Sequence, residues 1–314
     1  MAAIVITEFM DEDAIHGVLA SHDVLYDQTL VDRRDELLAA AAKADALIVR
    51  NRTRVDAALI DYAPQLKAVG RLGVGLDNID VEACKARGIA VYPATGANDR
   101  AVVEWVVAAM LVLLRGAYAA TESVIAGEWP RTKLMGREAG GKRLGLVGFG
   151  SIGRKVGAVA SALGMSVGAF DPHLAPGDAA WSQAWGKVEI CDFAGLLRGS
   201  DVISLHVPLT DATRNMIDSG AIEGMKEGAV LINAARGGVV DEAALASALR
   251  AGRLGGAALD VFAQEPVTRD AGRIFADCPN LLLTPHIAGV TVEANRRVSR
   301  MVAEKIRDHF AGAA

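Results

Sequence analysis

The chain has 314 residues, of which 52% are hydrophobic and 23% are charged, and this composition excludes a disordered or fibrous protein. Its formal net charge of −5 excludes a general attraction to nucleic acid or to a membrane surface. The three cysteines, Cys84, Cys191 and Cys278, are isolated in the sequence, so we expect neither a disulfide framework nor a metal site.

The first ninety residues alternate between short apolar runs and helical patterns. The N-terminus lacks the basic and long apolar regions of a secretion signal, so we expect a cytoplasmic protein whose fold begins with a strand. Strands are predicted over residues 4–7, 46–49, 67–69 and 89–92, and helices over residues 11–20, 31–42, 56–62 and 81–87. Such alternation predicts a parallel sheet that is covered by helices.

A long helical pattern follows, from Asp99 to about residue 127. Its apolar part, residues 101–114, carries Glu104 and is too short to span a membrane, so a buried helix between two halves of the chain is expected. Further strands are predicted over residues 202–205, 230–233, 256–259 and 281–283, with a helix over 241–251. The last predicted helix, residues 292–310, could pack back on the first half.

The second half is organised around the sequence Gly148-Phe149-Gly150-Ser151-Ile152-Gly153, which lies between an apolar run and a helical pattern. Gly148 allows a tight turn, Gly150 lets the backbone approach a pyrophosphate, and Gly153 lets the helix pack closely on the strand. The next apolar run, residues 166–170, leads into Asp171. Strand, helix, strand and acid together predict a dinucleotide-binding unit. A carboxylate at Asp171 would bind ribose hydroxyls and repel a 2′-phosphate, which favours NAD over NADP.

Three polar residues, Arg236, Glu265 and His286, follow apolar strands of the second half. Parallel strands end at the same edge of a sheet, so these side chains should emerge where the dinucleotide binds. An imidazole ordinarily titrates near neutral pH, which suits His286 to take a hydroxyl proton from an alcohol. Glu265 would orient the histidine ring, and the planar guanidinium of Arg236 matches a carboxylate or carbonyl oxygen.

The pattern as a whole predicts an α/β fold with two doubly wound domains. We expect a discontinuous, flavodoxin-like substrate domain of residues 1–97 plus 289–314, into which a Rossmann NAD-binding domain of residues 98–288 is inserted. The active site is expected in the cleft between these two domains.

Six segments together resemble the D-isomer-specific 2-hydroxyacid dehydrogenase family, and within it the 3-phosphoglycerate dehydrogenase branch. The segments cover nearly the whole chain: Gly73–Asp80, Gly148–Gly153, His206–Thr210, Asn233–Gly238, Ala258–Phe262 and Pro285-His286. The resemblance implies hydride transfer between NAD and C2 of a D-configured 2-hydroxy acid. Formate dehydrogenases of the superfamily place glutamine at the position of Glu265, so a hydroxy acid is favoured over formate. Ala288 departs from the glycine of many members, which leaves the role of the histidine intact.

The resemblance also assigns residues to roles. The catalytic set is Arg236, Glu265 and His286. Asp260 is similar to a residue that binds the nicotinamide carboxamide, and the backbone of Leu72, Gly73, Val74 and Gly75 to one that receives the substrate carboxylate. The residues expected to bind the cofactor are Gly148, Gly150, Ser151, Ile152, Gly153, Asp171, His206, Pro208, Ala234, Ala235, Asp260, His286 and Gly289.

Several arginines in this acidic chain suggest a second anionic group on C3 of the substrate. Arg50, Asn51 and Arg71 resemble positions that hold the phosphate in phosphoglycerate dehydrogenases, and Arg131 resembles one that is supplied by the neighbouring subunit of a homodimer. For Arg52 and Arg54 we expect solvated surface positions. The clamp fits 3-phosphoglycerate and 3-sulfolactate equally, because phosphate and sulfonate are tetrahedral oxyanions of similar size.

Other functions stay open at this point. Because the sequence ends at Ala314 without a regulatory domain, we expect a short, catabolic or unregulated form. Reduction of hydroxypyruvate or glyoxylate is the alternative activity and differs only in the substrate pocket. A non-enzymatic, NAD-sensing corepressor is a remote alternative, since such proteins keep the same three catalytic residues.

Overall fold

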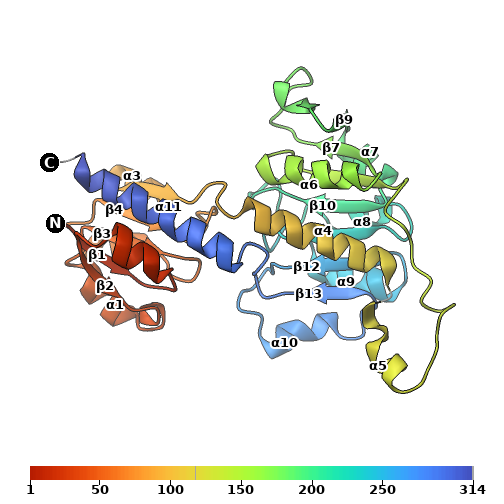
Figure 1. Ribbon diagram of the computed structural model, residues 1–314, viewed down its shortest axis with the longest axis horizontal. Coiled ribbons are helices and arrows are strands. Elements are labelled where there is room, and N and C mark those ends of the chain that lie inside the picture. Colours follow the sequence, from red (N-terminus) through yellow and green to blue (C-terminus); the bar gives the residue numbers. More distant parts are fainter. Residues whose placement is uncertain (117, 313–314) are drawn as a thin grey trace. The chain divides into compact units, whose positions relative to one another are not determined.

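The computed structural model describes residues 1–116 and 118–312 (Figure 1). It divides into two compact units: the first combines Met1–Asn98 with the C-terminal segment from Val290, and the second is Asp99–Gly289. Each unit consists of a largely parallel sheet with helices, so the prediction of an α/β fold is confirmed. Residue 117 of the predicted long helix and residues 313–314 of the predicted first domain lie outside the described residues.

Unit 1 contains a five-stranded parallel sheet in the order β2-β1-β3-β4-β5. Alternate residues of β1 lie in separate apolar clusters, with Ile4 and Ile6 in one and Val5 in the other. Both faces of this sheet are therefore covered, as is usual for parallel sheets. The strands are β1 (Ala3–Ile6), β2 (Asp23–Tyr26), β3 (Ala46–Val49), β4 (Ala68–Arg71) and β5 (Ala90–Pro93).

The C-terminal helix α11 (Val292–Ala311) packs on β4 through a close contact at Gly70. A Cβ atom at Gly70 would lie 2.5 Å from a methyl group of Val302, so only glycine lets the helix come this near. The remaining helices of unit 1 are α1 (Arg34–Ala41), α2 (Ala57–Tyr62) and α3 (Val81–Ala86), with single turns η1 (Ala14–Val18) and η2 (Leu30–Asp32).

Unit 2 contains an eight-stranded sheet in the order β13-β12-β11-β10-β6-β7-β9-β8, which is parallel except for the β8–β9 hairpin. Helices α4 and α6 lie side by side across this unit (Figure 1). The strands are β6 (Arg143–Val147), β7 (Ser166–Phe170), β8 (Ser182–Gln183), β9 (Gly186–Ile190), β10 (Val202–Leu205), β11 (Val230–Asn233), β12 (Gly256–Leu259) and β13 (Leu281–Leu283).

The helices of unit 2 connect these strands. They are α4 (Asp99–Arg115), α5 (Thr121–Ile125), α6 (Ser151–Ala162), α7 (Phe193–Gly199), α8 (Ser219–Gly224), α9 (Glu242–Arg250) and α10 (Arg269–Gly272), with single turns η3 (Tyr118–Ala120), η4 (Ala179–Trp181) and η5 (Arg273–Phe275). No helix in the described part of the chain is long and apolar enough to cross a membrane.

Some predicted elements were wrong in extent. The helix predicted from Asp99 to residue 127 ends at Arg115, because Gly116 takes a φ of 62° in the left-handed region that commonly ends helices. The helix predicted over residues 11–20 is shorter, because only residues 12–18 are helical. The edge strand β2 was missed because polar and apolar residues do not alternate along it, and its exposed positions include the apolar Leu25. The β8–β9 hairpin was also missed.

Both sheets contain a switch point, where the strand order reverses direction. In unit 2 the chain runs from β6 outward to β7 and β9, and then returns to β10 on the other side of β6. In unit 1 it runs from β1 to β2, and then to β3 on the other side of β1. Open α/β sheets bind ligands beyond the carboxyl ends of strands at such points, which places the candidate sites after β6 and β10, and after β1 and β3.

Candidate active site

The glycine turn after β6 has two glycines that the fold itself requires and one that it does not. Gly148 takes a φ of 93°, and a Cβ atom there would lie 2.5 Å from the carbonyl oxygen of His206. A Cβ atom at Gly153 would lie 2.6 Å from the carbonyl oxygen of Gly148. A Cβ atom at Gly150 would meet nothing within 4 Å. The two outer glycines of the turn therefore pack against backbone of the protein, whereas the central glycine has free space beside it, as a bound pyrophosphate requires.

The helix that follows this turn has no side-chain cap. Gly150 is the N-cap of α6 and contributes no side-chain hydrogen bond, whereas Asp192, Asp218 and Asp241 cap the N-termini of α7, α8 and α9 in the same unit. An uncapped helix N-terminus offers backbone N–H groups and a positive dipole end to an anion. The residues of the turn therefore fit a dinucleotide phosphate.

Two acidic residues flank the turn. The carboxylate of Asp171, the predicted ribose ligand, accepts hydrogen bonds from the Phe149 N–H (2.9 Å) and the His173 N–H (3.0 Å). These bonds hold the carboxylate beside the turn and leave it further acceptor capacity. Ser151 donates its hydroxyl to the buried carboxylate of Asp99, which also receives Lys155 Nζ at 2.6 Å. Ser151 is thereby oriented by the first residue of unit 2.

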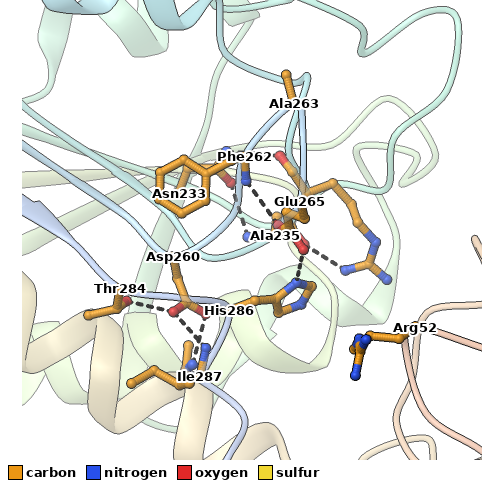
Figure 2. Close-up of polar contacts among 12 residues, drawn as sticks. Arg52, Asn233, Ala235, Asp260, Phe262, Ala263, Glu265, Thr284, His286 and Ile287 are labelled. Carbon is orange, nitrogen blue, oxygen red and sulfur yellow. Dashed lines mark hydrogen bonds and ion pairs between the residues drawn. The ribbon is translucent and has the colours of Figure 1, made fainter. Parts of the chain in front are cut away.

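The predicted base and its carboxylate partner are in contact at the carboxyl edge of the same sheet. His286 Nδ1 lies 2.7 Å from Glu265 Oε2, and the two side chains point toward each other (Figure 2). They are about one-third exposed, at 36% and 30%. The geometry leaves Nε2 of the imidazole as the ring nitrogen that can exchange a proton with a ligand.

The surroundings of Glu265 favour its ionised form. Burial raises the pKa of Glu265, but hydrogen bonds from His286 and from the Phe262 N–H (2.9 Å), together with the positive charge of Arg236, outweigh burial and hold the pKa below its usual value. An ionised carboxylate at this position accepts the Nδ1 proton of the ring, which fixes the tautomer and orientation of His286.

The backbone of His286 is held in an uncommon conformation by Asp260. His286 has a φ of 57°, and its N–H donates to the carbonyl oxygens of Asp260 (2.8 Å) and Thr284 (3.0 Å). The Asp260 carboxylate, 1% exposed, accepts the Thr284 hydroxyl and the N–H groups of Ile287 and Ala288 (Figure 2). A left-handed conformation costs a non-glycine residue about 1–3 kcal/mol, so the surrounding bonds must impose it. Asp260 thus positions the loop that carries His286, and its contact with the carboxamide stays a prediction.

Asn233 organises the loop of Arg236 and was missed by the sequence reasoning. It is buried at the end of β11, where its side chain donates to the Arg236 carbonyl oxygen (2.9 Å) and accepts the Ala235 N–H (3.0 Å). Arg236 Nη1 donates to the carbonyl oxygen of Ala235 at 2.6 Å. The signal that could have found Asn233 is a polar residue at the last position of an apolar strand.

The remaining predicted cofactor residues lie at the same edge. His206 follows β10, and its Nε2 lies 3.0 Å from Ser204 Oγ. Burial lowers the pKa of His206 to about 4, so the ring is neutral at physiological pH and suits a lining position better than a cationic one. Pro208, Ala234, Ala235 and Gly289 belong to the loops that follow β10, β11 and β13. No group of three or more histidine, cysteine or acidic side chains among the described residues could hold a metal ion.

The predicted anion-binding residues of unit 1 follow β3 and β4, which are neighbours in the sheet. Arg71, the last residue of β4, is 9% exposed and donates to the Leu72 carbonyl oxygen at 2.8 Å. Arg50 is half-buried and donates to Asn295 Oδ1 of α11 at 2.7 Å. Arg52, in contrast, is exposed and forms an ion pair with Asp32, as its predicted surface role requires. Asn51 is exposed beside Arg50, and Arg131 lies in the exposed segment after α5.

Comparison with known proteins agrees with this geometry. Residues 107–288 match the family described as D-isomer specific 2-hydroxyacid dehydrogenase, NAD binding domain. The chain is 52% identical over 308 residues to the (S)-sulfolactate dehydrogenase of Chromohalobacter salexigens, with 98% of each chain covered. It is 44% identical over 273 residues to a D-3-phosphoglycerate dehydrogenase of Archaeoglobus fulgidus. The aligned region covers 87% of this chain and 51% of that protein. The chain therefore spans about half the length of that relative.

A solved structure shows the same arrangement of elements. D-lactate dehydrogenase from Aquifex aeolicus, solved in complex with NAD and lactic acid, is 29% identical with a TM-score of 0.87, and 98% of this chain and 96% of that chain are covered. The glycine turn, the contact between His286 and Glu265, and these similarities lead to one conclusion. The chain belongs to the D-isomer specific 2-hydroxyacid dehydrogenase family and is an NAD-dependent enzyme.

Proposed function

We propose that this enzyme transfers hydride between NAD and C2 of a 2-hydroxy acid that carries an anionic group on C3, with (S)-3-sulfolactate as the first candidate and D-3-phosphoglycerate as the second. Bound NAD supplies the hydride acceptor. His286 removes the proton of the C2 hydroxyl through Nε2, and Glu265 holds the ring and stabilises the imidazolium that forms. Arg236 binds the substrate carboxylate and stabilises charge that develops on the C2 oxygen.

The observation that carries the choice of substrate is the state of Arg50. Its guanidinium is half-buried, yet among the described residues it donates a hydrogen bond to the neutral side chain of Asn295, and no carboxylate there lies within 4.0 Å to form an ion pair. Burial lowers the pKa of Arg50, against the opposing charge of Glu8, which means that the cation is poorly solvated. A tetrahedral oxyanion on the substrate would compensate this buried charge.

The relatives favour sulfonate over phosphate. The similarity to a protein named (S)-sulfolactate dehydrogenase extends over 98% of both chains, whereas the phosphoglycerate dehydrogenase is matched over half its length.

We further propose that the cofactor residues named from the sequence bind NAD and that residues of unit 1 bind the substrate. We also propose that the enzyme works as a cytoplasmic homodimer to which Arg131 contributes across the interface. Size determination and cell fractionation test the last two points.

The test is NAD reduction with (S)-3-sulfolactate, D-3-phosphoglycerate and D-glycerate as parallel substrates. We expect kcat/KM for a C3-anionic acid to exceed that for D-glycerate by about 100-fold or more, because a substrate without the C3 anion leaves the half-buried charge of Arg50 uncompensated. The preferred oxyanion then identifies the substrate. Equal activity on D-glycerate, or higher activity on hydroxypyruvate and glyoxylate in the reverse direction, would refute the C3 anion.

A further inference from the structure

Glu8 occupies the switch point of unit 1, directly beyond β1. The residue is 5% exposed, and its carboxylate accepts three backbone N–H groups of the loop after β3. Oε1 accepts from Arg50 (2.9 Å) and Thr53 (3.0 Å), and Oε2 accepts from Arg52 (3.2 Å). Converging N–H groups of this kind form an anion-binding concavity. In this protein its occupant is a carboxylate of the chain itself.

The same loop is held from its other side by Asn78. Asn78 Nδ2 donates to the carbonyl oxygens of Arg50 (3.0 Å) and Thr53 (2.6 Å). The hydroxyls of Thr7 and Thr53 lie 2.7 Å apart, which ties the end of the loop to the residue after β1. Side chains therefore bond three backbone N–H groups and two carbonyl oxygens of residues 50–53, which restrains the loop before any ligand arrives.

This bracing determines how unit 1 can bind an anion. Since the backbone N–H groups are used by Glu8, a substrate oxyanion must be bound by side chains. Of the two arginines of this loop, Arg52 pairs with Asp32, whereas Arg50 has no carboxylate partner in the described part of the chain. The guanidinium carbon of Arg50 lies 5.6 Å from the centre of the Phe9 ring, and its Nη2 contacts Asn295. Its direction depends on the backbone at residue 50, which Glu8 and Asn78 fix.

We propose that Glu8 is a positioning residue that holds the Arg50 loop ready for the C3 oxyanion and thereby sets the preference for C3-anionic over neutral hydroxy acids. This inference rests on the proposed function. A loop that is already ordered loses less conformational entropy when the substrate binds. Loss of the hydrogen bonds from the loop to Glu8 should therefore raise KM for the anionic substrate. The negative charge of Glu8 acts in the opposite sense, because its removal alone would strengthen anion binding. The sign of the change in KM therefore distinguishes the two roles.

The experiment compares Glu8→Gln with Asp32→Asn. Each variant removes one carboxylate charge beside the same loop, but Asp32 contacts the Arg52 side chain and accepts none of the three backbone N–H groups. We measure kcat and KM for (S)-3-sulfolactate, D-3-phosphoglycerate and D-glycerate at saturating NAD. Glu8→Gln should raise KM for the preferred C3-anionic acid about tenfold, while kcat and the D-glycerate constants change less than about twofold. Asp32→Asn should change every constant by less than about twofold.

The outcomes separate this inference from the proposed function. If the wild-type enzyme prefers a C3-anionic acid and Glu8→Gln leaves that preference undiminished, or lowers KM, the role of Glu8 is overturned and the proposed function stands. If the wild-type enzyme has no such preference, both are overturned. Should Glu8→Gln fail to fold, Asn78→Ser releases the same loop from its carbonyl side. If Asn78→Ser raises KM for the C3-anionic acid but not for D-glycerate, the result supports positioning of Arg50 by the loop. A folded Asn78→Ser variant with unchanged selectivity overturns this role.

Discussion

Two loops that follow strands of this enzyme differ in whether their backbone N–H groups are available to a bound anion. The turn after β6 in unit 2 ends in an uncapped helix, and its central residue Gly150 faces open space. The loop after β3 in unit 1 has three N–H groups that converge in a similar manner, but Glu8 already occupies them. Both lie at the switch point of a parallel sheet.

If the proposed function holds, this difference lets one type of sheet edge bind two kinds of ligand. Backbone N–H groups are fixed by the fold and tolerate little variation, which suits a phosphate that every NAD molecule carries. Side chains on a braced loop can change between enzymes without disturbing the sheet, which suits a substrate that differs among family members. The predictions below test this division, from the largest expected effect to the smallest.

The chemical step should depend on neither turn. His286→Ala removes the proton acceptor, so kcat should fall by about 10²–10⁴-fold, while the Kd for NADH changes little because the glycine turn is intact. Stopped-flow or steady-state rates with fluorescence titration of NADH measure both quantities. A parallel loss of NADH affinity would mean that His286 acts mainly in cofactor binding.

The side-chain site should fail selectively. Arg71→Ala removes a buried cation at the end of β4, so KM for the preferred C3-anionic acid should rise by about 100-fold, whereas KM for D-glycerate should change only a few-fold. Initial-rate kinetics with both substrates provide the comparison. Equal increases for the two acids would show that Arg71 binds the C1 carboxylate or supports the fold.

A substitution at the centre of the glycine turn should weaken NADH binding without loss of protein stability. Gly150 has φ −75° and ψ −161°, which any residue can adopt, so Gly150→Ala should keep the Tm and raise the Kd for NADH about tenfold by intruding on the pyrophosphate. Gly148→Ala is the matched control. Its φ of 93° and its contact with His206 predict destabilisation by at least about 1–3 kcal/mol. Unchanged NADH binding by Gly150→Ala would place the pyrophosphate elsewhere.

The smallest expected effect at neutral pH concerns His206, which lies beside the glycine turn, because this effect develops only as the pH falls. Burial lowers the pKa of His206 from 6.5 to about 4, so between these values the unfolded chain binds a proton that the native chain does not. The stability contributed by neutral His206 is therefore complete above pH 6.5 and is lost as pH falls toward 4, by up to about 3 kcal/mol. Denaturant unfolding of wild type and His206→Gln at pH 7 and pH 4.5 measures the difference. Equal pH slopes in the two proteins would contradict it.

The sequence predicted the central strands of both sheets because these strands are apolar on both faces and short. It also predicted the contact between His286 and Glu265, since each follows a strand of the same parallel sheet and such strands end together. The missed elements, β2 and the β8–β9 hairpin, lie at sheet edges where exposed residues dilute the apolar pattern.

By itself, the sequence determined the glycine turn after β6 and the α/β class, and it predicted a catalytic set, because glycine spacing and strand-end polar residues are local features. Tertiary structure decided which polar groups brace the sites. Glu8 reaches a loop more than forty residues away, Asp260 holds the loop of His286, and Asn295 of the last helix contacts Arg50. Such contacts depend on strand order and helix packing, which no local sequence pattern encodes. They also distinguish the half-buried Arg50, which is held by Asn295, from the exposed Arg52.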